Sequence, residues 1–331
     1  MNPEICLIVD SNIEKGSGHL SRCVALANAL VKRNKDSSIK ILKVYDQESI
    51  SSPKFDYQSI FEFKVQIKDL ENILRSQTYQ TYIIDLPDES MFKIQHWLPK
   101  KSKTILVVDR PDERINAGIV VVPNLVSKSN IKKYRKIIHA EHLYIGPEWM
   151  PLRNEFYNYK PFDIRNNLEK VGAYFGSVDK ENQMLKVFET SGVNIFRKII
   201  FEVIGNSDKF ISEGNFFIEK KKLNYTDYLF NCDLFVGSLG VSAWERSFMG
   251  VPSLVTFQGP DQVDDYEEVL RLNSAIGLGS AEELTRDMLC EKLEELVINF
   301  KRREELSIQS RKIMENHVRK SSEFVAQIAN A

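Results

Sequence analysis

The sequence lacks a long apolar run, an excess of one charge sign and an export signal. Basic residues number 45 and acidic residues 46, so no global field gathers nucleic acid or anionic lipid. Apolar runs such as Ile5 to Val9 are far shorter than the roughly 18 residues that a membrane span needs. No basic leader with a small-residue cleavage site precedes the first apolar run. We therefore expect no nucleic-acid partner, no membrane span and a cytoplasmic location.

Paired metal-ligand or disulfide spacings are also missing. The four cysteines are scattered, at Cys6, Cys23, Cys232 and Cys290. His139 and His142 are close enough for a helical metal pair, but no third ligand is nearby, and a surface or packing role is favoured. The sequence therefore predicts buried thiols, no metal site and no cofactor.

The order of apolar runs indicates an α/β protein. The 331 residues are more than one hydrophobic core usually fills, so the length predicts two domains of about 150 residues each. Short apolar runs alternate with helical stretches, which is typical of parallel sheets covered by helices. We expect a helix over Leu20 to Val31 and strands over residues 5–9, 39–44, 82–84, 104–108, 119–122, 171–175, 198–203, 215–218, 234–236 and 253–257.

The pattern breaks in the polar segment around Pro161, which places the domain boundary there. We predict an N-terminal Rossmann-like domain over residues 1–157 and a C-terminal one over 168–331, with the terminal helices packing near the domain junction. Two such domains facing each other would leave a cleft between them.

A glycine-containing loop follows the first expected strand. It contains Gly16, Ser17 and Gly18, and His19 comes directly after them. The glycines allow backbone amides to approach an anion, and the helix N-terminus adds partial positive charge. His19 is placed to act in the cleft as a general base or acid, and capping or packing is an equally good interpretation. Arg22 is expected to contact phosphate or orient the loop, with a surface ion pair as the alternative. The third glycine of a dinucleotide fold is missing, which disfavours NAD.

A second turn has the same design. A short buried strand ends in a Gly-Ser-Leu-Gly turn, and a helix follows. We expect free amides of this turn to hold a diphosphate without a metal, and an ordinary strand-to-helix turn is the alternative. The residues expected to bind substrate here are Gly237, Ser238, Leu239, Gly240, Val241 and Ser242.

Three further polar residues follow this turn. Glu245 has two interpretations: it closes a capping box with Ser242, or its carboxylate accepts hydrogen bonds from a ribose diol. Asp261 and Gln262 follow the next strand, where Gln262 is suited to bind phosphate or sugar; a plain turn is the alternative.

Four blocks of the chain, taken together, resemble a known family. They are Gly16 to Cys23, Gly146 to Phe156, Phe175 to Ser177 and Trp244 to Ser253. In this order they resemble the UDP-sugar hydrolases of the pseudaminic acid pathway, the PseG family, which is similar to the MurG branch of GT-B glycosyltransferases. The sequence departs from the family pattern at Leu86-Pro87 and Asp109-Arg110-Pro111, and its second turn lacks the usual adjacent glycines.

The resemblance implies a GT-B fold and a UDP-sugar substrate. His19 would activate the water that attacks the anomeric carbon, Glu245 would hold the uridine ribose, and the glycine turns would hold the diphosphate. The products would be UDP and a free diacetamido trideoxy sugar for nonulosonic acid synthesis. Two alternatives stay open: a GT-B glycosyltransferase of surface glycan assembly, and a nucleotide-sugar binding protein without catalysis. The sequence leaves the sugar, the stereochemical outcome and the oligomeric state open.

Overall fold

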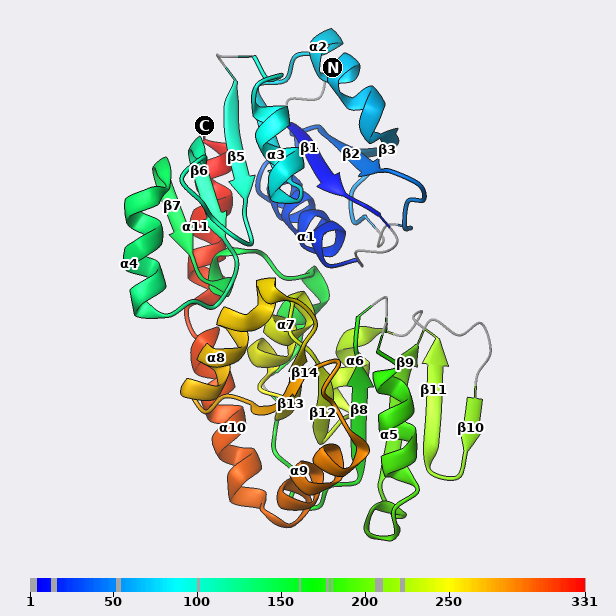
Figure 1. The fold of residues 1–331 in the computed structure, drawn as a ribbon. Coiled ribbons are helices and arrows are strands. Elements are labelled where there is room, and N and C mark those ends of the chain that lie inside the picture. Colours follow the sequence, from blue (N-terminus) through cyan, green and yellow to red (C-terminus); the bar gives the residue numbers. More distant parts are fainter. Residues whose placement is uncertain are drawn as a thin grey trace. The chain divides into compact units, whose positions relative to one another are not determined.

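The computed structural model contains two compact units. They comprise Met1–Asn154 with Asn316–Ala331, and Glu155–Glu315 (Figure 1). The structure describes residues 5–12, 17–51, 55–99, 102–160, 162–176, 179, 181–205, 211–220 and 224–330.

The first unit is built on a seven-stranded sheet in the order β3-β2-β1-β4-β5-β6-β7, and its neighbouring strands pair in parallel. Its strands are β1 (Ile5–Asp10), β2 (Ile39–Tyr45), β3 (Ile60–Gln66), β4 (Thr81–Asp85), β5 (Lys103–Val107), β6 (Asn116–Val122) and β7 (His139–Ile145). Its helices are α1 (Gly18–Arg33), α2 (Leu70–Ser76), α3 (Asp88–Gln95), α4 (Lys128–Ile137) and α11 (His317–Ala329), with short 3-10 turns at Ile67–Asp69 and Pro147–Trp149.

Helices cover both faces of this sheet. On one face Leu7 and Val9 pack in a core with Leu26 of α1 and Phe324 of α11. On the other face Ile8 belongs to a core that includes residues of α2, α3 and α4. Every residue of β1 is therefore buried, which explains the uninterrupted apolar run that predicted this strand.

The C-terminal helix α11 packs on the first unit. The Phe324 ring lies 5.2 Å from the Tyr144 ring, centroid to centroid, and Lys320 pairs with Glu148. The compact units therefore differ from the sequence-based division at 1–157 and 168–331, because the last helix returns to the first sheet. The sequence of α11 shows an apolar face but does not indicate which of the two sheets this face covers.

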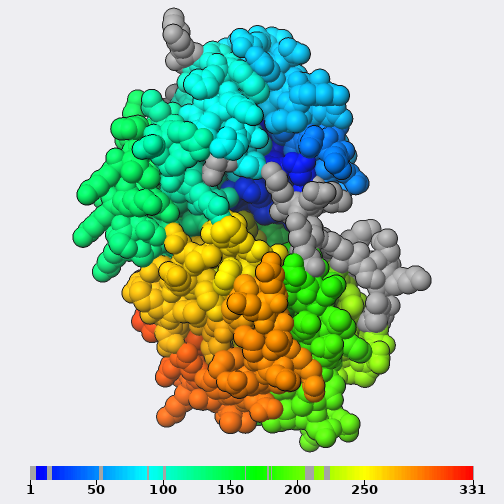
Figure 2. All heavy atoms as spheres, in the orientation of Figure 1, coloured from blue at the N-terminus to red at the C-terminus, as the bar shows by residue number. Residues whose placement is uncertain are grey.

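The second unit has another seven-stranded sheet, in the order β10-β11-β9-β8-β12-β13-β14. β10 pairs antiparallel with β11, and the other pairs are parallel. The strands are β8 (Lys170–Tyr174), β9 (Ile200–Gly205), β10 (Ile211–Glu213), β11 (Phe216–Lys220), β12 (Leu234–Ser238), β13 (Ser253–Phe257) and β14 (Ile276–Ser280). The helices are α5 (Gln183–Ser191), α6 (Tyr225–Phe230), α7 (Val241–Met249), α8 (Val263–Arg271), α9 (Arg286–Ile298) and α10 (Phe300–Ile313), with 3-10 turns at Asn154–Asn158, Asn194–Phe196 and Pro260–Gln262. In Figure 2 the yellow α8 region and the orange α9 region lie on one face of this unit.

Interior strands match the sequence prediction, whereas four strands near sheet edges were missed: β3, β7, β10 and β14. Phe61 and Phe63 of β3 are each 48% exposed, so the strand lacks the buried apolar run of an interior strand.

His139 and His142 lie on β7, so a helical metal pair is ruled out, and no three potential metal ligands cluster among the described residues. Within the described part of the chain, no helix has the length and apolar character needed to cross a bilayer.

Candidate functional site

The first candidate site lies where β1 leads into α1. Gly16 lies outside the described residues, while Ser17 is the N-cap residue of α1 and Gly18 is its first helical residue. His19 follows, with 23% of its side chain exposed. The start of α1 therefore presents an imidazole that solvent reaches.

His19 is held by a buried carboxylate. Its Nδ1 lies 2.6 Å from Oδ1 of Asp85, the last residue of β4, and the Asp85 side chain is fully buried. An ionised carboxylate only accepts hydrogen bonds, so His19 Nδ1 is the donor. The 3.0 Å approach of Arg22 Nη2 to Nδ1 is then a contact between two donors and not a hydrogen bond. In the neutral imidazole the proton is then on Nδ1 and the lone pair is on Nε2, and this tautomer can accept a proton at Nε2.

Arg22 joins two carboxylates. Its Nε and Nη2 each lie 2.6 Å from an oxygen of Asp85, and its Nη1 and Nη2 lie 2.8 and 3.0 Å from the oxygens of Asp109. Four of its five N–H groups are therefore directed to these acids. The Cys23 thiol also donates to Asp85, at 3.3 Å. The geometry supports orientation of the site as the role of Arg22 more strongly than direct contact with phosphate.

The charges of this cluster shift its proton equilibria. Burial lowers the pKa of His19, but the charge of Asp85 and its hydrogen bond more than offset this, so the pKa lies above its ordinary value. Burial alone would raise the pKa of Asp85, but the charges of Arg22 and His19 hold it below its usual range. Asp85 therefore stays ionised beside His19 at neutral pH.

Asp85 and Asp109 were not among the site residues that the sequence predicted. Asp85 is the last residue of the buried strand β4, and Asp109 lies two residues beyond the apolar strand β5, so both lie at the carboxyl ends where open α/β sheets bind ligands. An acid at or just beyond the end of a buried apolar strand was the available signal. The same signal at Asp10 is not specific enough to distinguish a site residue from a turn residue.

The second candidate site begins at the end of β12. Gly237 and Ser238 belong to this strand, and a Cβ on Gly237 would come within 2.5 Å of the Tyr174 carbonyl oxygen. Leu239 donates its N–H to Thr256, so its amide is already used in the sheet. Gly240 caps α7 with φ +130° and ψ −164°, a conformation that essentially only glycine adopts. The first amides of a helix have no partner within the helix, and here the Ala243 amide already donates to the Gly240 carbonyl oxygen at 2.9 Å. The amides suited to an anion are therefore those of Gly240, Val241 and Ser242.

Three of the predicted residues lie in α7: Val241 and Ser242 in its first turn, and Glu245 one turn further on. The capping box of Ser242 and Glu245 is wrong, because the cap is Gly240 and the Ser242 hydroxyl accepts a hydrogen bond from Arg246 Nη1 at 3.2 Å. Glu245 is only 3% exposed. Arg246 also donates to the Ser238 carbonyl oxygen at 3.0 Å, which ties α7 to the end of β12. Val241 is the first helical residue.

The next loop lies against the Gly240 turn. A Cβ on Gly240 would lie 3.9 Å from Gln262 Nε2, and Gln262 Oε1 accepts from the Gln258 amide at 2.9 Å. Gln258 Nε2 donates to the Phe175 carbonyl oxygen at the end of β8, at 2.6 Å. The ends of β8, β12 and β13 are thus linked. Asp261 lies in the same loop, in the 3-10 turn after Gly259.

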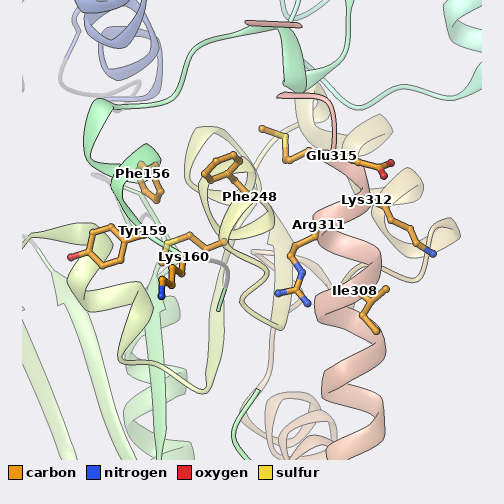
Figure 3. A pocket seen from close by; sticks show the side chains of 10 residues that line it. Phe156, Tyr159, Lys160, Phe248, Ile308, Arg311, Lys312 and Glu315 are labelled. Carbon is orange, nitrogen blue, oxygen red and sulfur yellow. The ribbon is translucent and has the colours of Figure 1, made fainter. Parts of the chain in front are cut away.

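A cavity of about 330 Å³ lies in the second unit at the other end of α7 (Figure 3). It is lined by Phe156, Tyr159, Lys160, Phe248, Met249, Ile308, Arg311, Lys312, Met314 and Glu315. None of the sequence-predicted site residues lines it. The cavity is therefore separate from the Gly240 turn, which lies at the N-terminal end of the same helix.

The fold resembles that of glycosyltransferases. Similar solved structures include UGT89C1 of Arabidopsis thaliana complexed with UDP, at 13% identity and TM-score 0.67 over 99% of this chain and 100% of that one. UGT71G1 of Medicago truncatula complexed with UDP-glucose has 13% identity and TM-score 0.66 over 99% and 98%. TcCGT1 in complex with UDP has 14% identity and TM-score 0.69 over 100% and 99%. The chain therefore has the GT-B fold, as the sequence predicted.

At the level of sequence, the chain is similar to an uncharacterized protein over most of its own length. No protein-family model matches the chain. The uncharacterized protein MJ1062 of Methanocaldococcus jannaschii is 26% identical over 298 residues, which cover 85% of this chain. The match covers 61% of that relative's length, so the chain corresponds to about three fifths of it.

Proposed function

We propose that this protein is an enzyme of the GT-B class that cleaves the anomeric bond of a UDP-sugar. The observation that carries the proposal is the His19–Asp85 pair at the start of α1, at 2.6 Å, because it prepares an imidazole to accept a proton. Similarity to glycosyltransferase structures that contain UDP or UDP-glucose supports the nucleotide-sugar substrate.

The second unit would bind the nucleotide part. Amides of Gly240 and of the first turn of α7 would hold the diphosphate, because a helix N-terminus favours a bound anion. Gln262, beside Gly240, would donate from its Nε2 to a phosphate or sugar oxygen. Asp261 would accept hydrogen bonds from sugar hydroxyls. Glu245, a residue that is 3% exposed, would accept hydrogen bonds from the ribose diol once ligand binding uncovers its carboxylate.

The first unit would activate the nucleophile. In the neutral form His19 Nε2 takes a proton from the attacking oxygen, while Asp85 stabilises the imidazolium that results. The attacking oxygen forms a bond to the anomeric carbon. The bond from that carbon to the phosphate oxygen breaks, and its electron pair leaves with UDP. Amides around the diphosphate would stabilise the charge that develops there.

Two nucleophiles fit this chemistry. A sugar or lipid hydroxyl would make the protein a glycosyltransferase, and the glycosyltransferase fold of the structural neighbours favours this candidate. Water would make it a hydrolase that releases UDP and a free diacetamido trideoxy sugar for pseudaminic acid synthesis. The sequence blocks around His19 and Glu245 favour this second candidate.

Product analysis separates these functions. The protein is incubated with UDP-linked diacetamido sugars and common UDP-hexoses, with and without alcohol acceptors, and free UDP and sugar products are measured. UDP release only with an added acceptor supports transfer, and release with free sugar in buffer supports hydrolysis. Binding of UDP-sugars without turnover under all conditions would contradict the proposal and indicate a binding protein. His139→Ala, on the exposed edge strand β7, is the matched control for His19→Ala.

A further inference from the structure

The first candidate site contains a second acceptor beside the His19 base. Oδ2 of Asp109 lies 3.8 Å from His19 Nε2, too far for a direct hydrogen bond. Asp109 follows β5 and is 25% exposed, so solvent reaches its carboxylate. Arg22 donates to both of its oxygens and fixes its orientation. Each oxygen retains room for a further donor, because a carboxylate offers about four acceptor positions.

The separation suits one atom that donates twice. At an oxygen about 2.8 Å from both His19 Nε2 and Asp109 Oδ2, the angle between the directions to these two atoms is about 85°. This is close to the H–O–H angle of water, so each of its two hydrogen bonds departs from linearity by only about 10°. In that position one hydrogen points to His19 and the other to Asp109. Both acceptors are then satisfied by a single oxygen.

An alcohol cannot satisfy both groups. Its oxygen carries one hydrogen, which must be directed to His19 if His19 is the base. A lone pair of the alcohol would then face an acceptor oxygen of the Asp109 carboxylate, which is electrostatically unfavourable. The two acceptors thus distinguish water, whose oxygen carries two hydrogens, from an alcohol, whose oxygen carries one.

We propose that Asp109 is a specificity-determining residue that, together with His19, selects water over an alcohol as the nucleophile. The inference rests on the proposed function and decides between its two candidate reactions. Water forms the bond to the anomeric carbon, one of its protons passes to His19 Nε2, and the bonding electrons of the broken bond leave with UDP. The second hydrogen stays on the new sugar hydroxyl, where it donates to Asp109.

The test uses competition between water and methanol. The substrate is a UDP-sugar that the wild-type protein cleaves, in buffer with a fixed share of methanol. The ratio of methyl glycoside to free sugar is measured for wild type, Asp109→Asn and the control Glu113→Gln. Glu113 is an exposed acid in the same loop. The asparagine keeps an oxygen for Arg22 and turns a donor N–H₂ to the nucleophile. We expect Asp109→Asn to lower free-sugar formation roughly tenfold or more, and to raise the glycoside ratio by a similar factor, because a hydrogen bond to a charged group is lost.

Three results can be distinguished. Turnover by wild type with a ratio that Asp109→Asn leaves unchanged overturns the role of Asp109 but not the proposed function. A wild type that forms glycoside in proportion to methanol also overturns it. Absence of UDP release from every donor, with water or methanol, refutes the proposed function itself. UDP affinity and thermal unfolding of Asp109→Asn verify folding, and Asp109→Glu, which keeps the charge, is expected to regain part of the preference for water.

Discussion

Replacing Asp85 by asparagine is the most informative perturbation of the first candidate site. Asp85 is fully buried and accepts three N–H hydrogen bonds, one from His19 and two from Arg22, all at 2.6 Å. An asparagine has one acceptor oxygen, and its N–H₂ group must face at least one of these donors. His19 also loses the acceptor that fixes its Nδ1–H tautomer.

The cost follows from this geometry. An unsatisfied buried group beside a buried cation costs about 3 kcal/mol, less than a fully unpaired charge would, because Asp109 still neutralises Arg22. For a unit of about 170 residues, the size of the first unit, about 1 kcal/mol shifts the Tm by about 2–4 °C, so the expected loss for the unfolding of that unit is about 6–12 °C. UDP release should fall by on the order of 10³-fold or more, because the imidazole no longer holds its base form in place.

Thermal unfolding followed by circular dichroism measures the first effect, and UDP release measures the second. Asp36→Asn, at an exposed turn after α1, is the matched control and should change neither quantity. An Asp85→Asn protein with a wild-type Tm and wild-type turnover would refute the assignment of Asp85 as the partner of His19.

Three other outcomes follow from the structure. Activity should rise with pH through the raised pKa of His19, because only the neutral imidazole accepts a proton, and a flat pH–rate profile would contradict the base role. The protonated imidazole also stabilises the fold: this contribution is fully present below the ordinary pKa of histidine and is lost as the pH rises through the raised pKa of His19. Gly240→Ala should weaken UDP binding about tenfold or more, because φ +130° strains an alanine, whereas Gly192→Ala at φ −73° should bind UDP normally in the same calorimetric titration. Among the four cysteines only Cys290 is not buried, and burial raises the pKa of Cys6 to about 12, so native protein should react with one equivalent of maleimide; rapid labelling of two or more thiols would contradict this packing.

Sequence patterns predicted the interior of both sheets because buried parallel strands are continuous apolar runs. β1 and β12 are buried throughout and were predicted within one or two residues. Edge strands carry one exposed face or very few residues, as β3 and the three-residue β10 do, so they give no such run. The position of α11 depends on which sheet has an open face, and no local pattern records that.

The candidate site was predicted in part for a similar reason. His19 and the Gly240 turn stand at loop-to-helix junctions, which a sequence displays directly. The partners Asp85 and Asp109 lie 66 residues beyond His19 and 87 residues beyond Arg22. Their approach requires β4 to pair with β1 and β5 to pair with β4, and strand order is not encoded in local sequence.

In the proposed mechanism His19 acts on the nucleophile and does not bind the nucleotide. The decisive measurement is single-turnover release of UDP, made together with UDP affinity, for wild type, His19→Ala and His139→Ala. We expect His19→Ala to lose on the order of 10³-fold or more in the rate of release while its affinity for UDP changes less than about threefold. An unchanged rate, or a loss explained entirely by weaker UDP binding, would rule out His19 as the base.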